Sequence, residues 1–246
     1  MEEKKIETQA KGVNEKIGQD GVDSIFGNNS KHKGATSGVD VLLDKGNAST
    51  ARLPMLEVIF DRFVRLLSNS LRIHMSYTVD ADIENLSTTR FGEYIDNLPV
   101  PTMIAPFKAL EWDNFGLVVI DGYFIYSLID ILFGGRKLEP SLKVEGRPYT
   151  SIERNIVQNI GELLLNDLSS AFEPVTPVNF HIDRLESNPK FATIVRPEDI
   201  VISLKLNVRM ESRHGHIDLI LPYSTIEPVK KILAKSFIGE KGTKDP

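Results

Sequence analysis

The chain has 246 residues, a length that allows one large domain or two small ones. Its 29 lysine and arginine residues against 34 acidic residues give a net charge of −5, which disfavours a nucleic-acid partner bound through phosphate neutralisation. The absence of cysteine excludes a disulfide framework, a thiolate nucleophile and a cysteine-based zinc site. No apolar stretch approaches the roughly 20 residues that span a bilayer, and no signal segment follows the charged N-terminus. We therefore expect a cytoplasmic protein without membrane insertion.

Residues 1–51 are rich in Gly, Ser, Asn, Lys and Asp and contain one aromatic residue, Phe26. Such a segment buries too little apolar surface to offset the entropy of ordering, so we predict a disordered tail. Within it, Ile17, Val22, Ile25 and Phe26 would gather on one face of a short helix. A helix of that length is unstable alone in water. These four apolar residues are therefore either a chance cluster or part of a segment that folds against a partner.

Two long amphipathic helices are predicted in the rest of the chain. Apolar residues from Leu56 to Leu71 recur every three or four positions after Pro54, which suits the first turn of a helix. The second helix begins at the capping box formed by Thr150 and Glu153 and continues to about residue 168. Segments typical of strands follow the two helices, at 77–85, 91–95, 103–110 and 116–120, and at 178–185, 191–195, 200–210 and 216–221. Each half then ends in a predicted helix, at 123–133 and 224–237.

The two halves form an internal repeat with an offset of about 100 residues. Apolar residues match across it, for example Leu117 with Ile217 and Ile120 with Ile220, whereas polar positions diverge. We place the two repeats at about 52–137 and 150–238. They predict an α+β fold in the broad α/β class, with pseudo-two-fold symmetry and helices packed on a central, mainly antiparallel sheet.

The chain offers little for catalysis or metal binding. His214 and His216 have the spacing of two ligands on one strand face, but no third ligand follows. Gly215 between them suggests a hairpin, which favours a solvated loop over a metal site. The acidic run 80–84 lacks the later Gly and Glu of a calcium loop and is interpreted as the solvated face of a strand. We therefore expect no catalytic residues, no cofactor and no metal.

Gly134 and Gly135 follow directly on the predicted helix 123–133. A helix stop explains one glycine, because glycine accepts the left-handed conformation without strain. A second glycine, followed by Arg136 and Lys137, indicates a flexible basic loop between the repeats. Loops on rigid scaffolds often carry function, so this loop is a reasonable place for a partner contact.

Several strings in residues 52–238 closely resemble the middle domain of the bacterial flagellar motor switch protein FliM family. They are Phe91-Gly92-Glu93-Tyr94-Ile95, Leu98-Pro99-Val100-Pro101-Thr102, Leu132-Phe133-Gly134-Gly135, and Val144-Glu145-Gly146-Arg147 with Thr150 and Glu153. The resemblance implies a CheC-like fold and a C-ring component that controls flagellar rotation in chemotaxis, at the cytoplasmic face of the inner membrane in the basal body. It implies neighbouring FliM copies in a ring. It also implies contact with the rotor protein FliG through Gly134, Gly135, Arg136 and Lys137, of which the last stands where the family usually has another glycine.

The tail segment 17–26 is similar to the leading peptide of that family, which captures the phosphorylated response regulator CheY. The resemblance implies that phospho-CheY is bound by Ile17, Gln19, Asp20, Val22, Asp23, Ile25 and Phe26. Gly18 and Gly21 replace the usual Ser and Glu, and each glycine costs about 1 kcal/mol in helix propensity. Family members continue past residue 238 into a FliN-like domain. We interpret 239–246 as a terminal linker and expect contact with FliN only where that domain is present.

Two alternatives to a switch component stay open. The related CheC phosphatases place a Glu-x-x-Asn motif on each of two long helices and dephosphorylate CheY. Asn69 and Asn159 stand at the asparagine positions here, but Leu66 and Ile156 occupy the acidic positions, which argues against an enzyme. The other alternative is an assembly module that never touches the regulator.

Overall fold

The computed structural model describes residues 53–135, 147–211 and 213–235. In these ranges six strands form one antiparallel sheet in the order β1-β5-β6-β3-β2-β4. The strands are β1 (Asp80–Arg90), β2 (Thr102–Ala109), β3 (Asn114–Asp121), β4 (Phe180–Ile182), β5 (Ile200–Met210) and β6 (Arg213–Pro222). The helices are α3 (Pro54–Met75), α4 (Phe91–Asp96), α5 (Gly122–Leu132), α6 (Ser151–Phe172), α7 (Tyr223–Ile226) and α8 (Lys230–Leu233), with 3₁₀ turns η1 (Pro189–Phe191) and η2 (Glu227–Val229). The predicted fold of helices on an antiparallel sheet is confirmed, whereas the predicted tail 1–51 and linker 239–246 lie outside the described residues.

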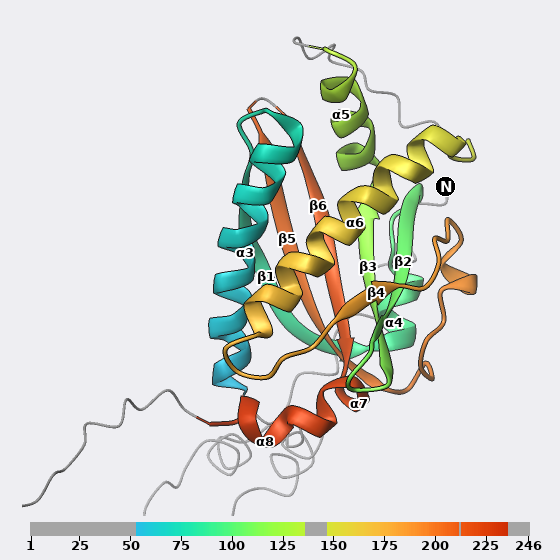
Figure 1. The fold of residues 1–246 in the computed structure, drawn as a ribbon. Helices are drawn as coiled ribbons and strands as arrows, with labels where there is room; N and C mark the ends of the chain where they lie inside the picture. Colours follow the sequence, from blue (N-terminus) through green and yellow to red (C-terminus); the bar gives the residue numbers. More distant parts are fainter. Residues whose placement is uncertain (1–52, 136–146, 212, 236–246) are drawn as a thin grey trace, which may run out of the picture. The chain divides into compact units, whose positions relative to one another are not determined.

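The long helices α3 and α6 lie across one face of the sheet and pack against each other (Figure 1). The apolar stripe of α3 puts Phe60, Phe63 and Leu67 fully inside the main core. The helix α6 starts at the predicted capping box, where Glu153 N–H donates to Thr150 Oγ1 at 3.3 Å and Thr150 N–H donates to the Glu153 carboxylate at 2.6 Å. The apolar stripe of α3 and the capping box of α6 therefore explain why both helices form where the sequence predicts them.

A smaller apolar cluster lies on the other face of the sheet. Phe91, Ile104, Leu117 and Val201 are among its members. Strands were predicted at 91–95 and 191–195, and both predictions are wrong, because 91–96 forms α4, Phe191 ends η1 and 192–195 has no regular structure. Aromatic and β-branched residues favoured strands there. The spacing of Phe91, Tyr94 and Ile95, three and four residues apart, fits the helix that forms.

The two halves of the sheet are related by an approximate two-fold axis. Exchanging β1 with β4, β2 with β5 and β3 with β6 reverses the strand order and leaves it otherwise unchanged. The offset is not uniform. The offset is 97 residues between the long helices, which begin at residues 54 and 151. It is 99 residues between β2 and β5, since the pair Phe107–Ile182 in one half corresponds to the pair Leu206–Ile83 in the other. It is 101 residues between β3 and β6, where Val118 pairs with its own counterpart, Leu219.

This variable offset corrects the residue matches made at an offset of 100. Leu117 lies in the smaller cluster on the second face, whereas Ile217 lies in the main core. Ile120 and Ile220 are exchanged in the same way. Side chains alternate between faces along a strand, so an error of one residue moves a match to the wrong side of the sheet.

The predicted helix at 224–237 is broken into α7, η2 and α8 within the described residues. Pro228 lies in η2. Proline lacks the N–H needed for a continuous helical ladder, which accounts for the interruption. The last predicted residues of this helix, 236–237, lie outside the described ranges.

Candidate functional site

The helix α5 extends past the sheet and ends in the Gly134–Gly135 turn (Figure 1). Gly134 has a φ of +87°, and its N–H donates to the carbonyl of Ile131 at 2.9 Å. The N–H of Gly135 donates to the carbonyl of Asp130 at 2.8 Å. These two bonds form the Schellman motif that closes many helices with a left-handed glycine. The helix stop predicted for one of the glycines is confirmed at Gly134.

The second glycine is explained by packing. A Cβ atom on Gly135 would overlap the carboxylate of Asp130. That carboxylate is not free to turn away, because it forms an ion pair with Arg213 at the start of β6. The Arg213 guanidinium also donates to the carbonyls of Gly135 at 3.2 Å and Ser127 at 3.3 Å, and only 3% of its side chain is exposed. The turn is thus fixed to a strand of the other repeat.

The start of α5 is attached to the same strand. One Asp121 carboxylate oxygen accepts from the N–H of Phe124 at 2.6 Å, and the other accepts from the N–H of His216 at 3.0 Å. Burial raises the pKa of Asp121, although both hydrogen bonds favour the charged form. Gly215 lies against the backbone of Phe124 without room for a Cβ. Gly215 is therefore a packing residue inside β6. The predicted hairpin is present, since β5 and β6 pair from Met210 and Arg213 onward, but the predicted solvated loop is wrong because His214, Gly215 and His216 all lie in the second strand.

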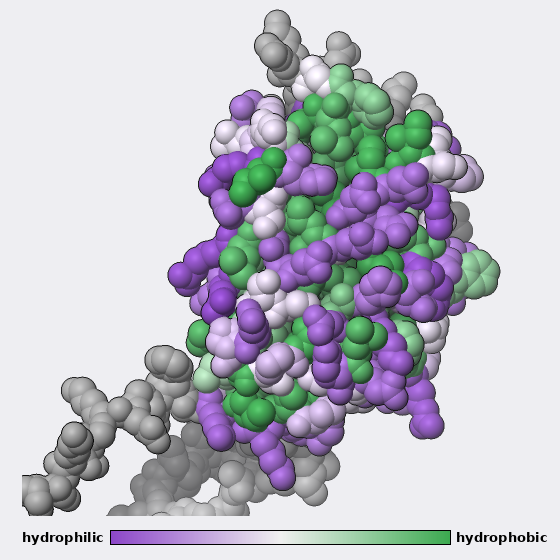
Figure 2. All heavy atoms as spheres, in the orientation of Figure 1, coloured by the Kyte–Doolittle hydropathy of each residue, from purple (hydrophilic) through white to green (hydrophobic). Residues whose placement is uncertain are grey.

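Apolar side chains gather around the end of α5. Phe133, directly before the turn, is 72% exposed, and Leu132 is 41% exposed. Figure 2 shows hydrophobic surface at this end of the molecule, separated by hydrophilic bands from other apolar regions. An exposed aromatic residue on a fixed turn has the character of a contact residue, since little conformational entropy remains to be lost on binding.

Arg147 contacts side chains of both α5 and α6. Its guanidinium makes two hydrogen bonds to the Glu153 carboxylate, at 2.6 and 3.0 Å, and lies 5.7 Å from the ring centre of Tyr126 in α5. Tyr126 in turn stacks on Tyr149. The bond from Arg147 is the main reason that the pKa of Glu153 falls to about 2, and the hydrogen bonds from Thr150 lower it further. Arg147, Thr150 and Glu153, which occur in the family-like strings, therefore form one anchor.

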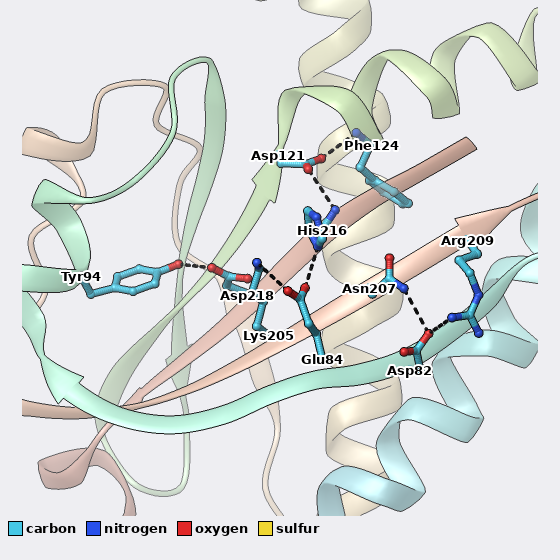
Figure 3. Close-up of polar contacts among 10 residues, drawn as sticks. All are labelled: Asp82, Glu84, Tyr94, Asp121, Phe124, Lys205, Asn207, Arg209, His216 and Asp218. Atoms are coloured by element: carbon cyan, nitrogen blue, oxygen red, sulfur yellow. Dashed lines mark hydrogen bonds and ion pairs between the residues drawn. The ribbon is translucent and has the colours of Figure 1, made fainter. Parts of the chain in front are cut away.

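A polar network occupies part of the second sheet face (Figure 3). Glu84 lies at a bulge in β1, which directs its carboxylate to within 3.0 Å of both Lys205 Nζ and His216 Nδ1. Next to it the Tyr94 hydroxyl donates to Asp218 at 2.8 Å, and burial raises the pKa of Asp218. Tyr94, Lys205, His216 and Asp218 border a cavity of about 270 Å³.

This network also bears on the predicted pair of histidines. His214 is exposed and His216 faces Glu84. Within the ranges that the structure describes, no three His, Asp or Glu side chains are grouped as metal ligands. The acidic run 80–84 belongs to β1 at the edge of the sheet, where Asp82 pairs with Arg209 at 2.8 Å. It is thus a strand, as predicted.

The two asparagines of the phosphatase alternative are both exposed, Asn69 on α3 and Asn159 on α6. They are not related by the two-fold axis. At the helix offset of 97 residues, Asn69 corresponds to Asn166 and Asn159 corresponds to Arg62.

Of the residues predicted for partner contacts, the structure describes Gly134 and Gly135. Arg136, Lys137 and the tail set Ile17, Gln19, Asp20, Val22, Asp23, Ile25 and Phe26 lie outside the described residues. Sequence reasoning missed Arg213 and Asp130. A signal for Asp130 was present, because it interrupts an apolar helix. Arg213 could have been noticed from the alternation in β6, which turns it toward the inside of the protein.

Comparisons with known proteins agree on the family. The family model described as "Flagellar motor switch protein FliM" matches residues 49–238. The chain belongs to the FliM family. It is 46% identical over 237 residues to FliM of Caulobacter vibrioides strain NA1000, which covers 95% of this chain and 63% of that protein. It is 30% identical to FliM of Pseudomonas aeruginosa PAO1, covering 79% of this chain and 59% of that protein. The chain thus spans less than two thirds of the length of these relatives.

Solved FliM structures share the fold. The middle domain of FliM from Vibrio alginolyticus is 27% identical and superimposes with a TM-score of 0.65, covering 73% of this chain and 99% of that one. A chain from a FliG–FliM complex of H. pylori is 26% identical with a TM-score of 0.68, covering 76% of this chain and all of the other. The expected FliM middle-domain fold is therefore confirmed.

Proposed function

We propose that this FliM chain is a switch component of the flagellar motor that contacts FliG at the Gly134–Gly135 turn, with Arg136, Lys137 and Phe133. The observation that carries the proposal is a fixed glycine turn with an exposed aromatic residue, in a chain similar to the FliM of a FliG–FliM complex. A preorganised turn loses little conformational freedom when a partner binds.

The contact is tested by replacing Phe133 with Ser and measuring FliG binding by calorimetry. Truncation of an exposed aromatic anchor weakens binding by about tenfold or more. The matched control is Phe191→Ser, because Phe191 is 65% exposed and lies in η1, away from α5. FliG affinity should fall for Phe133→Ser and stay unchanged for Phe191→Ser. Equal affinities of both variants would contradict a contact at the turn.

The second part of the proposal concerns the tail. Segment 17–26 captures phosphorylated CheY and holds it beside the folded domain, which raises the local concentration for a weak second contact. Deletion of 17–26 should abolish phospho-CheY binding and leave FliG binding intact. Loss of both interactions would contradict this division between a tail at 1–51 and a partner-binding domain at 52–238.

The third part of the proposal is that the chain acts through binding and not as an enzyme. Asn69 and Asn159 lack the acidic partner of a CheC-like phosphatase and are not related by the two-fold axis. Added to phospho-CheY, the chain should leave its lifetime unchanged, and faster loss of phosphate would instead support the phosphatase alternative. In the described ranges no helix is both long and apolar enough to cross a bilayer.

The remaining partners follow from the same proposal. The domain stands beside neighbouring copies in a ring at the cytoplasmic face of the inner membrane, and contact with FliN requires the FliN-like domain after the linker 239–246. No nucleic acid and no cofactor take part.

A further inference from the structure

We propose that Arg213 is a positioning residue: it holds the Gly134–Gly135 turn in one conformation and thereby sets the affinity of the turn for its protein partner. The partner is FliG, so the effect of Arg213 on binding affinity rests on the proposed function. The effect of Arg213 on the conformation of the turn depends only on contacts within the chain.

Arg213 joins the last turn of α5 to the sheet. Its guanidinium bonds to the side chain of Asp130 and to the carbonyls of Ser127 and Gly135, so one side chain serves three acceptors at the end of the helix. The C-terminal end of a helix carries partial negative charge, which favours a cation there. The guanidinium is nearly excluded from water, with 3% of the Arg213 side chain exposed, whereas 44% of the Asp130 side chain is exposed.

The same contact accounts for Gly135. Its conformation does not require glycine, since Gly134 is the glycine with positive φ among the described residues. The space beside it is filled by the Asp130 carboxylate, which an added Cβ would overlap. Relief of that overlap requires the carboxylate to leave Arg213. A side chain at position 135 and the Asp130–Arg213 pair are therefore mutually exclusive.

The fold itself does not require this pair. At the offset of 101 residues, Arg213 corresponds to Trp112 and Asp130 corresponds to Lys231 in the other repeat. Trp112 packs edge-on against Phe172 and Phe180 in the core, and Lys231 is exposed. The symmetry-related site, formed by Trp112 and Lys231, thus completes the same architecture without an arginine anchor. The anchor joins β6 of the second repeat to the end of α5 in the first repeat, where the glycine turn lies.

The anchor is tested with Arg213→Met, which keeps an unbranched apolar side chain in place of the arginine stem and removes all three bonds. Hydrogen exchange at the amides of Gly134 and Gly135 reports on the turn, and calorimetry reports FliG affinity. Arg209→Met is the matched control, because Arg209 lies on β5 in the same hairpin and pairs with Asp82, away from the turn. We expect Arg213→Met to accelerate exchange at both glycines and to weaken FliG binding by about tenfold, which corresponds to about 1.4 kcal/mol. Arg209→Met should change neither value.

Arg213→Lys separates positioning from mere stability. Lysine keeps the charge and can still pair with Asp130, so it should recover part of the protection at Gly135. Exchange in the centre of β5 and β6 is followed in every variant, and a uniform rise there together with the rise at the turn would overturn the positioning role. Unchanged exchange at Gly134 and Gly135 in Arg213→Met would also overturn it.

The mutual exclusion gives a second, independent test. Gly135→Ala should weaken FliG binding by about fivefold or more in the wild-type background and by less than about twofold in Asp130→Ala, because the clash is then absent. Equal factors in both backgrounds would overturn the coupling. Faster exchange at the turn with unchanged FliG affinity would keep the anchor and refute the proposed FliG contact, so the two failures are distinguishable.

Discussion

Removal of the negative charge of Glu153 should destabilise the protein at neutral pH and have little effect at low pH. Glu153→Gln is the suitable change, because glutamine retains the shape and can still serve the capping box with Thr150. What it loses is the charged, two-bond contact with Arg147. The side chain of Glu153 is 8% exposed, so water replaces that contact poorly.

The size of the effect follows from the pKa of Glu153, about 2 against an ordinary value of 4.5. At 1.36 kcal/mol for each tenfold change in the equilibrium constant, this difference of about 2.5 corresponds to about 3 kcal/mol. The side chain of Arg147 is 41% exposed, and solvent screening reduces the expected value to about 2 kcal/mol. Because the folded pKa is depressed, this stability is complete above about pH 5 and is lost as the pH falls toward 2.

The measurement is urea unfolding at several pH values between 7 and 3, followed by the fluorescence of Trp112. This residue is the single tryptophan of the chain and is buried against Phe172 and Phe180. The control is Glu162→Gln on the same helix, where the carboxylate is exposed and accepts a hydrogen bond from Gln158 at 3.1 Å. A difference between wild type and Glu153→Gln that does not shrink with falling pH would refute the reasoning. An equal loss in Glu162→Gln would refute it as well.

Two further changes test the turn and the polar network. Gly134→Ala forces a side chain into a φ of +87° and should lower the free energy of unfolding by about 1 kcal/mol, measurable by thermal unfolding; an unchanged midpoint would contradict the left-handed turn. The double change Tyr94→Phe and Asp218→Leu should raise stability in urea by about 1 kcal/mol or more, because it removes a buried carboxylate whose counterpart in the other repeat is Leu117. A loss of stability would show that the buried carboxylate is a net gain for the fold.

Local sequence signals predict most of the helices and strands correctly. The capping box placed the start of α6, the run 200–210 gave β5 with its bounds, and a glycine after an apolar helix gave the stop of α5. Each of these signals acts over a few residues of the chain. Their information is therefore present in the local sequence.

The errors came from features that depend on distant residues. The composition of 91–95 favours a strand, but Phe91 belongs to a cluster with Ala192 and Val201, and this tertiary packing selects a helix. The repeat was visible, whereas its offset of 97, 99 or 101 residues depends on loop lengths and on a single-residue register.

The functional turn shows the same division. Gly134 ends the helix with a positive φ, which a glycine after an apolar helix predicts from the local sequence. Gly135 is required because a Cβ there would overlap Asp130, whose position is fixed by Arg213, 83 residues away in the chain. No spacing rule connects Arg213 to Asp130. The partner contacts assigned to 17–26 and to Arg136 and Lys137 stay predictions.

The strand order has a consequence for the origin of the domain. Among the strands that the structure describes, the edge strand β1 is hydrogen-bonded only to β5, and the edge strand β4 only to β2. The first strand of each half thus pairs with a strand of the other half. A chain cut after Gly135 would leave two pieces that each lack the neighbour of their own edge strand. A single ancestral half could have built the same sheet by exchanging that strand with a second copy of itself. The domain can thus be regarded as a strand-swapped homodimer fused into one polypeptide.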